Sequence, residues 1–530
     1  INAITKSGTN RFNGNAFYEF TGDNLRRNIG EQTPDFTERF WGGTFGGPIL
    51  KDKLFFFGAY ENTSQFVPLA MGPAGSGNGV ERPWYSQADH DRIERIARDI
   101  YGYDTGGLPS DGERKADKLL LKVNWSISPK HNLGAIYNYF DGFEDRASDN
   151  DSNEFEFANH FYQKGAKSKT FTVKLTSQWT NAFSTELFLS RNTMDDSQIT
   201  VGPPDFADFQ ISIGGRDGTV YLGADDSRQA NALDTKSSFI KLAGQWLAGR
   251  HVLSGGYERE SLTIFNQFVQ HSRGGEYDYF DDSQSNPGFC AALSAQGRFD
   301  NPDCALSGMD RYELGRPSRI YYGSGGGSND PVDASAEFTN AKNSLYIQDS
   351  YFFDDYNLTL VGGLRYEFFT SGDRPVFNQT FSSQNPVRND ENIDGLSIWM
   401  PRLGFTWSVN DDLVLRGGLG KYSGGNPNVW LSNAWSNDGL TNVQTRLNNF
   451  GGSGSVLDGT SPITGSNPGF DDSVPQTLFD TVAGTTPEDA NDSFLVLISP
   501  DYKQPSEWKF AVGGTYRLPG DVQMDVDYLH

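Results

Sequence analysis

The stretch LLLKVNWSIS, residues 119–128, decides the fold, because its side chains alternate between two faces with a period of two. One face carries Leu119, Leu121, Val123, Trp125 and Ile127, and the other carries Leu120, Lys122, Asn124, Ser126 and Ser128. Successive side chains of a β-strand point to opposite faces, so the stretch predicts a strand with one apolar face. About ten residues is the length with which a tilted strand crosses a bilayer.

The same alternation recurs along the chain, and the links between the predicted strands are sorted by length. The predicted strands are 11–20, 39–47, 53–61, 116–127, 131–141, 168–179, 182–191, 236–247, 251–262, 341–352, 357–368, 401–408, 412–421, 507–517 and 521–530. Short links of hairpin length, such as SPKH and Pro519-Gly520, alternate strictly with long links such as 21–38 and 422–506. This predicts an all-β fold: a transmembrane antiparallel β-barrel with short periplasmic turns and long extracellular loops.

The composition excludes several other classes of protein. The chain of 530 residues has a formal net charge of −24, which disfavours a nucleic-acid partner, because phosphates are bound by Lys and Arg. Aromatic residues make up 14% of the chain, too many for a disordered one. The longest strongly apolar run, Leu54 to Tyr60, is far shorter than the roughly 20 residues of a membrane-spanning helix.

Alternating strands also occur in soluble sheets, so a soluble surface-layer or adhesion protein stays open as an alternative. The sorting of the links favours the barrel, and aromatic residues near strand ends, such as Tyr137 and Tyr139, fit interfacial girdles. A closed bacterial single-chain barrel has an even number of strands, whereas the predicted strands number an odd fifteen. We therefore expect further strands in the native protein.

Two blocks near the start resemble a known family. INAITKSGTNRFNGNAFYEF (1–20) resembles the junction between plug and barrel in TonB-dependent receptors, with Thr5, Lys6, Ser7, Gly8, Thr9 and Asn10 at the junction. FWGGTFGGPILKDKLFFFGAYE (40–61) resembles the next hairpin in the Oar-like branch of that family, through Gly42, Gly43, Gly46, Gly47, Pro48, Phe55, Phe56 and Phe57. Similar blocks are LTLVGGLRYE, PRLGFTWSVNDDLVLRGGLGKYSGG, NVWLSNAWSNDG and QPSEWKFAVGGTYRLPG.

The resemblance implies a 22-stranded barrel in the outer membrane of a Gram-negative bacterium, filled by an N-terminal plug. Residues 1–9 would be the end of the plug and residues 10–530 the barrel, without its last strands. It further implies import of an unknown ligand captured by the loops, powered by the TonB complex through a missing N-terminal region. Outer-membrane lipid, lipopolysaccharide and a surface lipoprotein are the other expected partners. The alternative is an Oar-like barrel with a structural, adhesion or protein-export role.

Motifs for enzyme chemistry are lacking, so we expect no catalytic activity, no cofactor and no metal site. The six His are scattered without an HExxH pair, and no G-x-S-x-G occurs. Asp149, Asp151 and Asn153 resemble the start of a calcium loop, but Glu154 and His160 occupy its sixth and twelfth positions. This excludes an EF-hand and favours a solvated acidic loop over an irregular calcium site.

Two further features lie in the long links. Cys290 and Cys304 are candidates for a disulfide that stiffens a loop, in preference to two free thiols. Ile93, Ile96, Ala97 and Ile100 have helical spacing, with Ser86 placed to begin the helix and Gly102 to end it. We expect this helix to pack its apolar stripe on neighbouring loops. Loop aromatics such as Trp84, Tyr85, Trp430 and Trp435 either stack on a ligand or hold the loops together.

Overall fold

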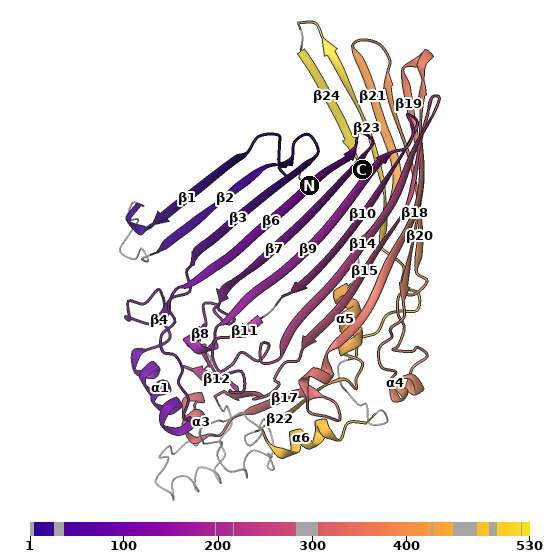
Figure 1. Ribbon diagram of the computed structural model, residues 1–530. Coiled ribbons are helices and arrows are strands. Elements are labelled where there is room, and N and C mark those ends of the chain that lie inside the picture. The colour runs from indigo at the N-terminus through magenta and orange to yellow at the C-terminus, as the bar shows by residue number, and fades with distance from the viewer. Residues whose placement is uncertain are drawn as a thin grey trace, which may run out of the picture.

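The computed structural model describes residues 5–25, 36–196, 198–215, 217–281, 306–425, 428–448, 474–486, 495–520 and 522–530. Its main element is an antiparallel sheet, here named the wall, whose strands pair in chain order from β1 to β24 (Figure 1). The wall strands are β1 (Asn13–Gly22), β2 (Thr37–Leu50), β3 (Leu54–Val67), β6 (Gly112–Ser128), β7 (His131–Arg146), β9 (Tyr162–Gln178), β10 (Phe183–Asp195), β14 (Asn231–Ala248), β15 (His251–Phe268), β18 (Ala336–Phe353), β19 (Leu358–Ser371), β20 (Ser397–Ser408), β21 (Leu413–Ser423), β23 (Ser506–Leu518) and β24 (Val522–Leu529).

The predicted fold class and every predicted strand are confirmed. Most of the strands are longer than predicted, mainly at the ends that join the long links, whereas β1 has the predicted length and β24 is shorter. β15 was expected at 251–262 but continues to Phe268, and β14 begins at Asn231 rather than at 236. Pairing continues there because ladder hydrogen bonds need only the backbone, whereas the apolar alternation is required only within the bilayer.

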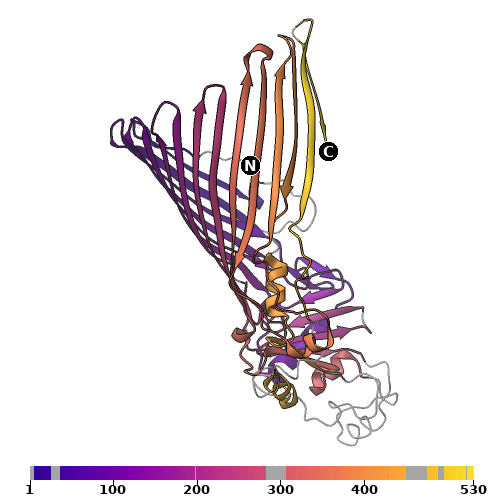
Figure 2. The ribbon, with the colours of Figure 1, turned by 90° about the vertical axis from the view of Figure 1, so that its right-hand side faces the viewer.

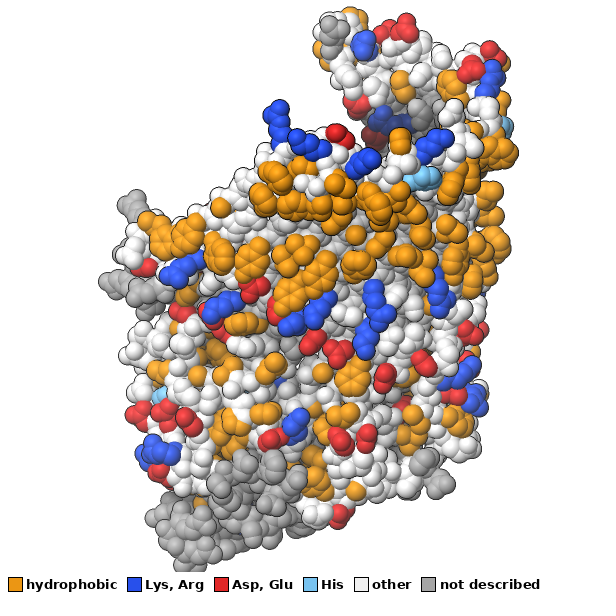
Figure 3. All heavy atoms as spheres, viewed as in Figure 1, with side chains coloured by type: hydrophobic (Ala, Val, Ile, Leu, Met, Phe, Trp, Pro, Cys, Tyr) orange, Lys and Arg blue, Asp and Glu red, His pale blue; other side chains and the backbone are white. Residues whose placement is uncertain are grey.

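The two faces of the wall differ in character. Leu121 of β6 pairs with Gly58 and Tyr137 on the neighbouring strands, and its side chain is 47% exposed on the outer face. Figure 3 shows apolar side chains gathered into a band across the strands, near the rim with the short turns. Figure 2 shows that the wall is curved. The face opposite the exposed apolar side chains, here named the inner face, carries polar residues such as Lys122 and Asn124.

The long links do not form loops alone, as the sequence suggested; they build a second sheet beyond the far ends of the strands. This mixed sheet has the order β22-β17-β16-β12-β13-β8. Its strands are β8 (Glu154–Glu156), β12 (Asp208–Ile213), β13 (Gly218–Leu222), β16 (Glu276–Tyr279), β17 (Arg319–Gly325) and β22 (Asn442–Asn448). The helices around it are α1 (Gln87–Tyr101), α3 (Gly308–Leu314) and α6 (Gln476–Ala483). We name this sheet with these helices the cap (Figures 1 and 2).

The cap has a core of its own. Phe209 of β12 is fully buried, and its ring centroid lies 5.1 Å from that of Tyr101 in α1 and 5.3 Å from that of Tyr279 in β16. The expected helix is confirmed as α1: the Ser86 side chain accepts from the Asp89 amide, and Gly102 ends the helix in the left-handed conformation. Its apolar stripe is buried, so the helix packs within the cap as expected.

The remaining elements are short. They are β4 (Met71–Pro73), β5 (Val80–Arg82), β11 (Gln198–Thr200), α4 (Gln379–Gln384), α5 (Asn428–Ser436) and the 3₁₀ turns Asp23–Leu25, Ala158–His160, Pro331–Ala334 and Asp354–Tyr356. Across the described ranges, no helix has both the length and the apolar character needed to cross a membrane.

Candidate functional site

The inner face of the wall carries ion pairs that link neighbouring strands. Glu186 of β10 lies 2.8 Å from Lys174 of β9 and 3.1 Å from Lys241 of β14. Farther along the sheet, Arg365 of β19 reaches across β18 to pair with Glu258 of β15 at 2.8 Å. These charged side chains lie on the face opposite the exposed apolar side chains, because successive residues of a strand alternate between the two faces. They give the interior a polar lining, as in other wide barrels.

Residues at the predicted plug–barrel junction lie against this inner face. Lys122 Nζ donates to the carbonyl oxygen of Thr5 at 3.2 Å and to its hydroxyl at 3.0 Å. A Cβ at Gly8 would lie 2.2 Å from the carbonyl oxygen of Phe56, so only glycine fits this close approach. The backbone amide of Asp52 donates to Asn10 Oδ1 at 2.8 Å. Lys6, Ser7 and Thr9 are exposed.

The glycines of the predicted hairpin motif make room for aromatic rings. Gly42, Gly43, Gly46, Gly47 and Pro48 lie on β2, and Phe55, Phe56 and Phe57 begin β3. A Cβ at Gly47 would meet the ring of Phe12 at 2.2 Å, so that ring takes the place of a side chain. Phe12 stacks on Phe45 with 5.9 Å between centroids and 7° between planes. The hairpin therefore fixes where the chain enters β1.

Helix α5 packs on the inner face, where β15, β18 and β19 reach the cap (Figure 1). Trp435 is buried, with its ring 4.6 Å from that of Phe338, so it holds α5 to the wall. Trp430 is 65% exposed and lines a cavity of about 270 Å³. Other residues lining this cavity are Val496, Ile498 and Tyr502. Of the four loop aromatics, Tyr85 and Trp435 belong to cores and Trp84 packs against the core of the cap, whereas the Trp430 ring is mostly exposed.

The polar face of the cap sheet concentrates buried acidic groups. β12 and β16 run parallel, with Asp208 beside Glu276 and Gln210 beside Asp278. Burial, together with the neighbouring Glu276, raises the pKa of Asp278 to about 8. Burial likewise raises the pKa of Glu156 on β8 to about 8. The alternation within these short strands therefore places aromatic residues on one face and carboxyl groups on the other.

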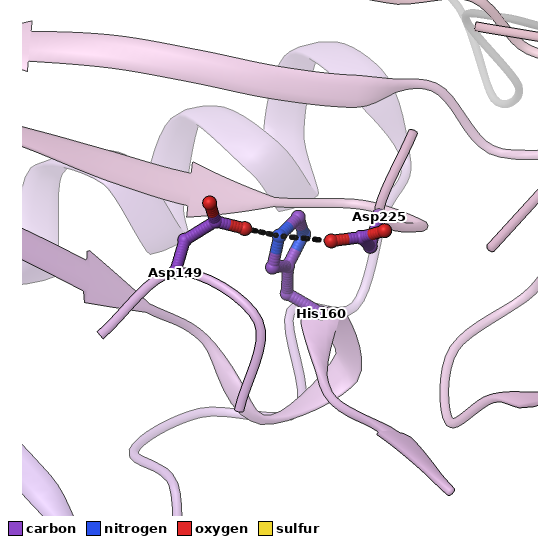
Figure 4. A group of neighbouring side chains, drawn as sticks. All are labelled: Asp149, His160 and Asp225. Carbon is purple, nitrogen blue, oxygen red and sulfur yellow. Dashed lines mark hydrogen bonds and ion pairs between the residues drawn. The ribbon is translucent and has the colours of Figure 1, made fainter. Parts of the chain in front are cut away.

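His160 lies at the centre of one such group (Figure 4). It is fully buried, and its Nε2 lies 3.1 Å from Asp149 Oδ2 and 3.9 Å from Asp225 Oδ2. Its Nδ1 lies 3.1 Å from the carbonyl oxygen of Gly223. Burial lowers the pKa of His160, but the hydrogen bond to Asp149 and the charge of Asp208 outweigh burial and raise that pKa well above its usual value.

His271 lies at the centre of a second group. Its Nε2 lies 2.8 Å from Glu276 Oε2 and 3.2 Å from Asp226 Oδ2, and its Nδ1 lies 3.1 Å from Gln444 Oε1. The backbone of His271 adopts a left-handed conformation with φ 52°, which is uncommon for a residue other than glycine. Burial lowers the pKa of His271, but the hydrogen bonds to Asp226 and Glu276 outweigh it and raise the pKa to about 11.

Sequence reasoning assembled neither group, because Asp225 joins Asp149 and His160, and Asp226 joins His271 and Glu276, from a different link of the chain. Within the expected solvated acidic loop, Asp151 is exposed, whereas Asp149 is half-buried and lies 3.1 Å from the buried His160. The local signals were the window from Asp149 to His160 and the neighbouring Asp225 and Asp226, one in each group, and a pair of aspartates is too common to be decisive. Cys290 and Cys304 lie outside the described residues, so the disulfide stays a prediction.

The geometry defines a class of protein. An antiparallel wall with an exposed apolar band outside, ion pairs inside, short turns at one rim and a folded cap beyond the other is an outer-membrane β-barrel.

Comparison with known proteins gives the family. Residues 4–70 and 103–529 match the model of the outer membrane beta barrel domain, and the chain belongs to that family. A segment of 70 residues, 11% of this chain and 7% of the relative, is 41% identical to the TonB-dependent transporter Oar of Myxococcus xanthus. This match confirms the resemblance noted in the sequence.

Solved structures share the fold. The outer membrane transporter YddB from Escherichia coli superposes with a TM-score of 0.54 at 12% identity, over 99% of this chain and 52% of that chain. The chain thus spans about half the length of the transporter it matches. It is a protein of the Gram-negative outer membrane.

Proposed function

We propose that this chain is most of the barrel of a TonB-dependent receptor that captures a ligand at the cap and imports it through the lumen. One observation carries the proposal: residues 5–10 run along the inner face before the chain enters β1, with hydrogen bonds from Lys122 to Thr5 and from the Asp52 amide to Asn10. The last strand of a plug would be tied to the barrel in this way. It supports a domain boundary between residues 9 and 10.

The ligand surface that fits this function lies at the mouth of the lumen. Trp430 exposes its ring beside the cavity between α5 and residues 496–502, above the charged inner face. An indole with one free face can stack on a sugar ring or an apolar side chain. We assign Trp430 as a ligand contact.

Lipopolysaccharide is the lipid partner that the outer face favours. Lys169, Arg191 and Lys236 are exposed on adjacent strands, and Thr193 pairs with both lysines across the sheet. Figure 3 shows Lys and Arg side chains bordering the apolar band on the side away from the short turns. The phosphates of lipopolysaccharide would meet such side chains at the membrane surface.

The test uses cells that lack the intact gene and complemented cells, each grown with and without a protonophore. The compounds that remain in the culture media are compared by mass spectrometry. Import predicts a compound that the complemented cells deplete and the deleted cells leave, with depletion abolished by the protonophore. Complementation with Trp430→Ala should slow depletion, whereas Trp84→Ala, which alters an aromatic residue of the cap away from the mouth, should not.

Two other outcomes would contradict import. A product that is missing from the medium of the deleted cells would favour the export role. Media that do not differ would favour a structural or adhesion role.

A further inference from the structure

The group around His160 brings together three donor residues from two links of the chain, Asp149 and His160 from the link between β7 and β9 and Asp225 from the link between β10 and β14. Asp149 follows β7, His160 ends a 3₁₀ turn, and Asp225 follows β13 (Figure 4). One carboxylate oxygen of each aspartate and one imidazole nitrogen all lie within 4.8 Å of one another. Asp225 Oδ1 accepts from the guanidinium of Arg228 at 3.0 Å, which leaves Oδ2 turned toward the imidazole.

The orientation of the imidazole is set by its other nitrogen. A carbonyl oxygen can only accept, so His160 Nδ1 carries the proton that it donates to Gly223. In the neutral ring, the lone pair is then on Nε2, which faces Asp149 and Asp225. Histidine ligands of metals are usually held in this way, with the second nitrogen donating to an oxygen.

A separate observation concerns Asp208, which lies on the other side of the imidazole. Its side chain is 2% exposed, its Oδ1 has no hydrogen-bond partner among the described residues, and that oxygen lies 3.9 Å from His160 Nδ1. A buried carboxylate oxygen without a donor is costly. When a cation binds Nε2, the ring loses electron density and its Nδ1–H becomes more positive. The Asp208 carboxylate is placed to stabilise that positive charge, as in carboxylate–histidine–metal arrangements.

We propose that Asp149, His160 and Asp225 bind a divalent first-row transition ion of the Zn²⁺ type, with Asp208 as a positioning residue. A set of one imidazole and two carboxylates suits such ions, whereas Ca²⁺ and Mg²⁺ take oxygen ligands. Ligand atoms around tetrahedral zinc lie about 3.3 Å apart. Asp149 is already at that separation from His160, and Asp225 reaches it by moving inward by a fraction of an ångström.

The bound ion joins two links of the chain, the one between β7 and β9 and the one between β10 and β14, and balances the negative charge that Asp149, Asp208 and Asp225 place around one imidazole. The group around His271 differs, because both of its carboxylates already lie within hydrogen-bond distance of Nε2, at 2.8 and 3.2 Å. In the His271 group, both carboxylates are therefore already paired with the imidazole. We use this group as the control site within the same molecule. The inference does not depend on TonB-coupled import.

The experiment uses the intact receptor, extracted in detergent, freed of any tag and treated with chelator. Zn²⁺ binding is measured by calorimetry and by metal analysis after gel filtration, and Co²⁺ is added as a spectroscopic probe of nitrogen ligation. We expect one strongly bound Zn²⁺. Asp149→Asn should weaken binding by tenfold or more, whereas Asp151→Asn, which removes the same charge from the exposed part of the same loop, should change it by less than twofold.

Further variants locate the site. His160→Gln should remove the visible Co²⁺ bands that report nitrogen ligation, and Asp208→Asn should weaken Zn²⁺ binding by threefold to tenfold. His271→Asn, which tolerates the left-handed backbone, should leave one Zn²⁺ bound. Hydrogen exchange of the cap in the metal-free variants separates loss of ligand from loss of fold.

Three results would overturn the proposal. The first is equal Zn²⁺ affinity in Asp149→Asn and Asp151→Asn, which would mean adventitious binding. The second is tighter binding of Ca²⁺ than of Zn²⁺. The third is absence of stoichiometric Zn²⁺ binding to the folded protein.

Discussion

The wall and the cap use the same alternation of apolar and polar side chains in opposite ways. In the wall, Leu121 turns its apolar side chain outward, where 47% of it is exposed; in the cap, Phe209 turns inward and is fully buried. A period of two therefore specifies that a strand has two faces, but not which face meets protein. The surroundings decide, because lipid covers the apolar face of the wall, whereas the cap stands in water and must cover its own.

The two regions also differ in how their strands meet. Each wall strand pairs with its neighbours in chain order, whereas the cap assembles its six strands from four separate links and includes the parallel pairs β12–β16 and β13–β8. Pairings of long sequence separation cost more chain entropy and form later. We infer that the cap closes after the wall and opens more easily.

The largest expected effect is loss of the aromatic core in the cap. Phe209→Ala removes the ring that contacts Tyr101, Tyr277 and Tyr279, and should cost about 3–5 kcal/mol of local stability. Hydrogen–deuterium exchange should show faster exchange in β12, β16 and α1, with wall amides unchanged. Equal acceleration in the wall would show that the two regions unfold together.

A charge on the outer face tests the wall in turn. Leu121→Arg places a cation in the apolar band and should cost about 2–4 kcal/mol, as at the midplane of other barrels. Asn124→Arg, on the inner face of the same strand, should cost far less because water reaches it. Unfolding by denaturant in lipid vesicles measures both. Similar costs for the two variants would contradict the assignment of the faces.

The wall and the cap also differ in how much of each could be predicted from the sequence. The wall strands were predictable because alternation, turn residues and link lengths are local signals. The cap strands were not, because they are as short as β8, with three residues, and most of their partners come from other links. His160 and Asp225 come together only through that long-range pairing, so no spacing in the sequence pointed to them. α1 was the exception, since Ser86 and Gly102 mark its ends locally.

The buried acids of the cap predict that the stability of the cap depends on pH. The pKa of Asp278 is raised to about 8, so its neutral form is favoured in the folded cap. Its contribution to stability is complete at low pH and is lost as pH rises toward 8, by up to about 1.4 kcal/mol per pH unit. Hydrogen exchange of the β16 amides, measured between pH 5 and 8 and corrected for intrinsic exchange rates, gives the free energy of opening. We expect this free energy to fall with pH by up to about 1.4 kcal/mol per unit.

Asp278→Asn serves as the control for this titration. It should flatten the pH dependence of β16 while leaving protection in β6 as it was. An unchanged slope in this variant would assign the effect to another buried acid of the cap, such as Glu156.

The smallest effect compares a hydroxyl in each region. Ser86→Ala removes the acceptor for the Asp89 amide at the start of α1 and should cost about 1 kcal/mol. Ser128→Ala removes an acceptor for the Lys130 amide at 3.2 Å in the turn between β6 and β7. There the long ladder of paired residues fixes the turn, so we expect almost no change. Hydrogen-exchange rates of α1 and of the β6–β7 hairpin in the two variants test this difference. A comparable loss of stability in the hairpin would mean that side chains of the turns, and not the ladder alone, stabilise the rim of the wall.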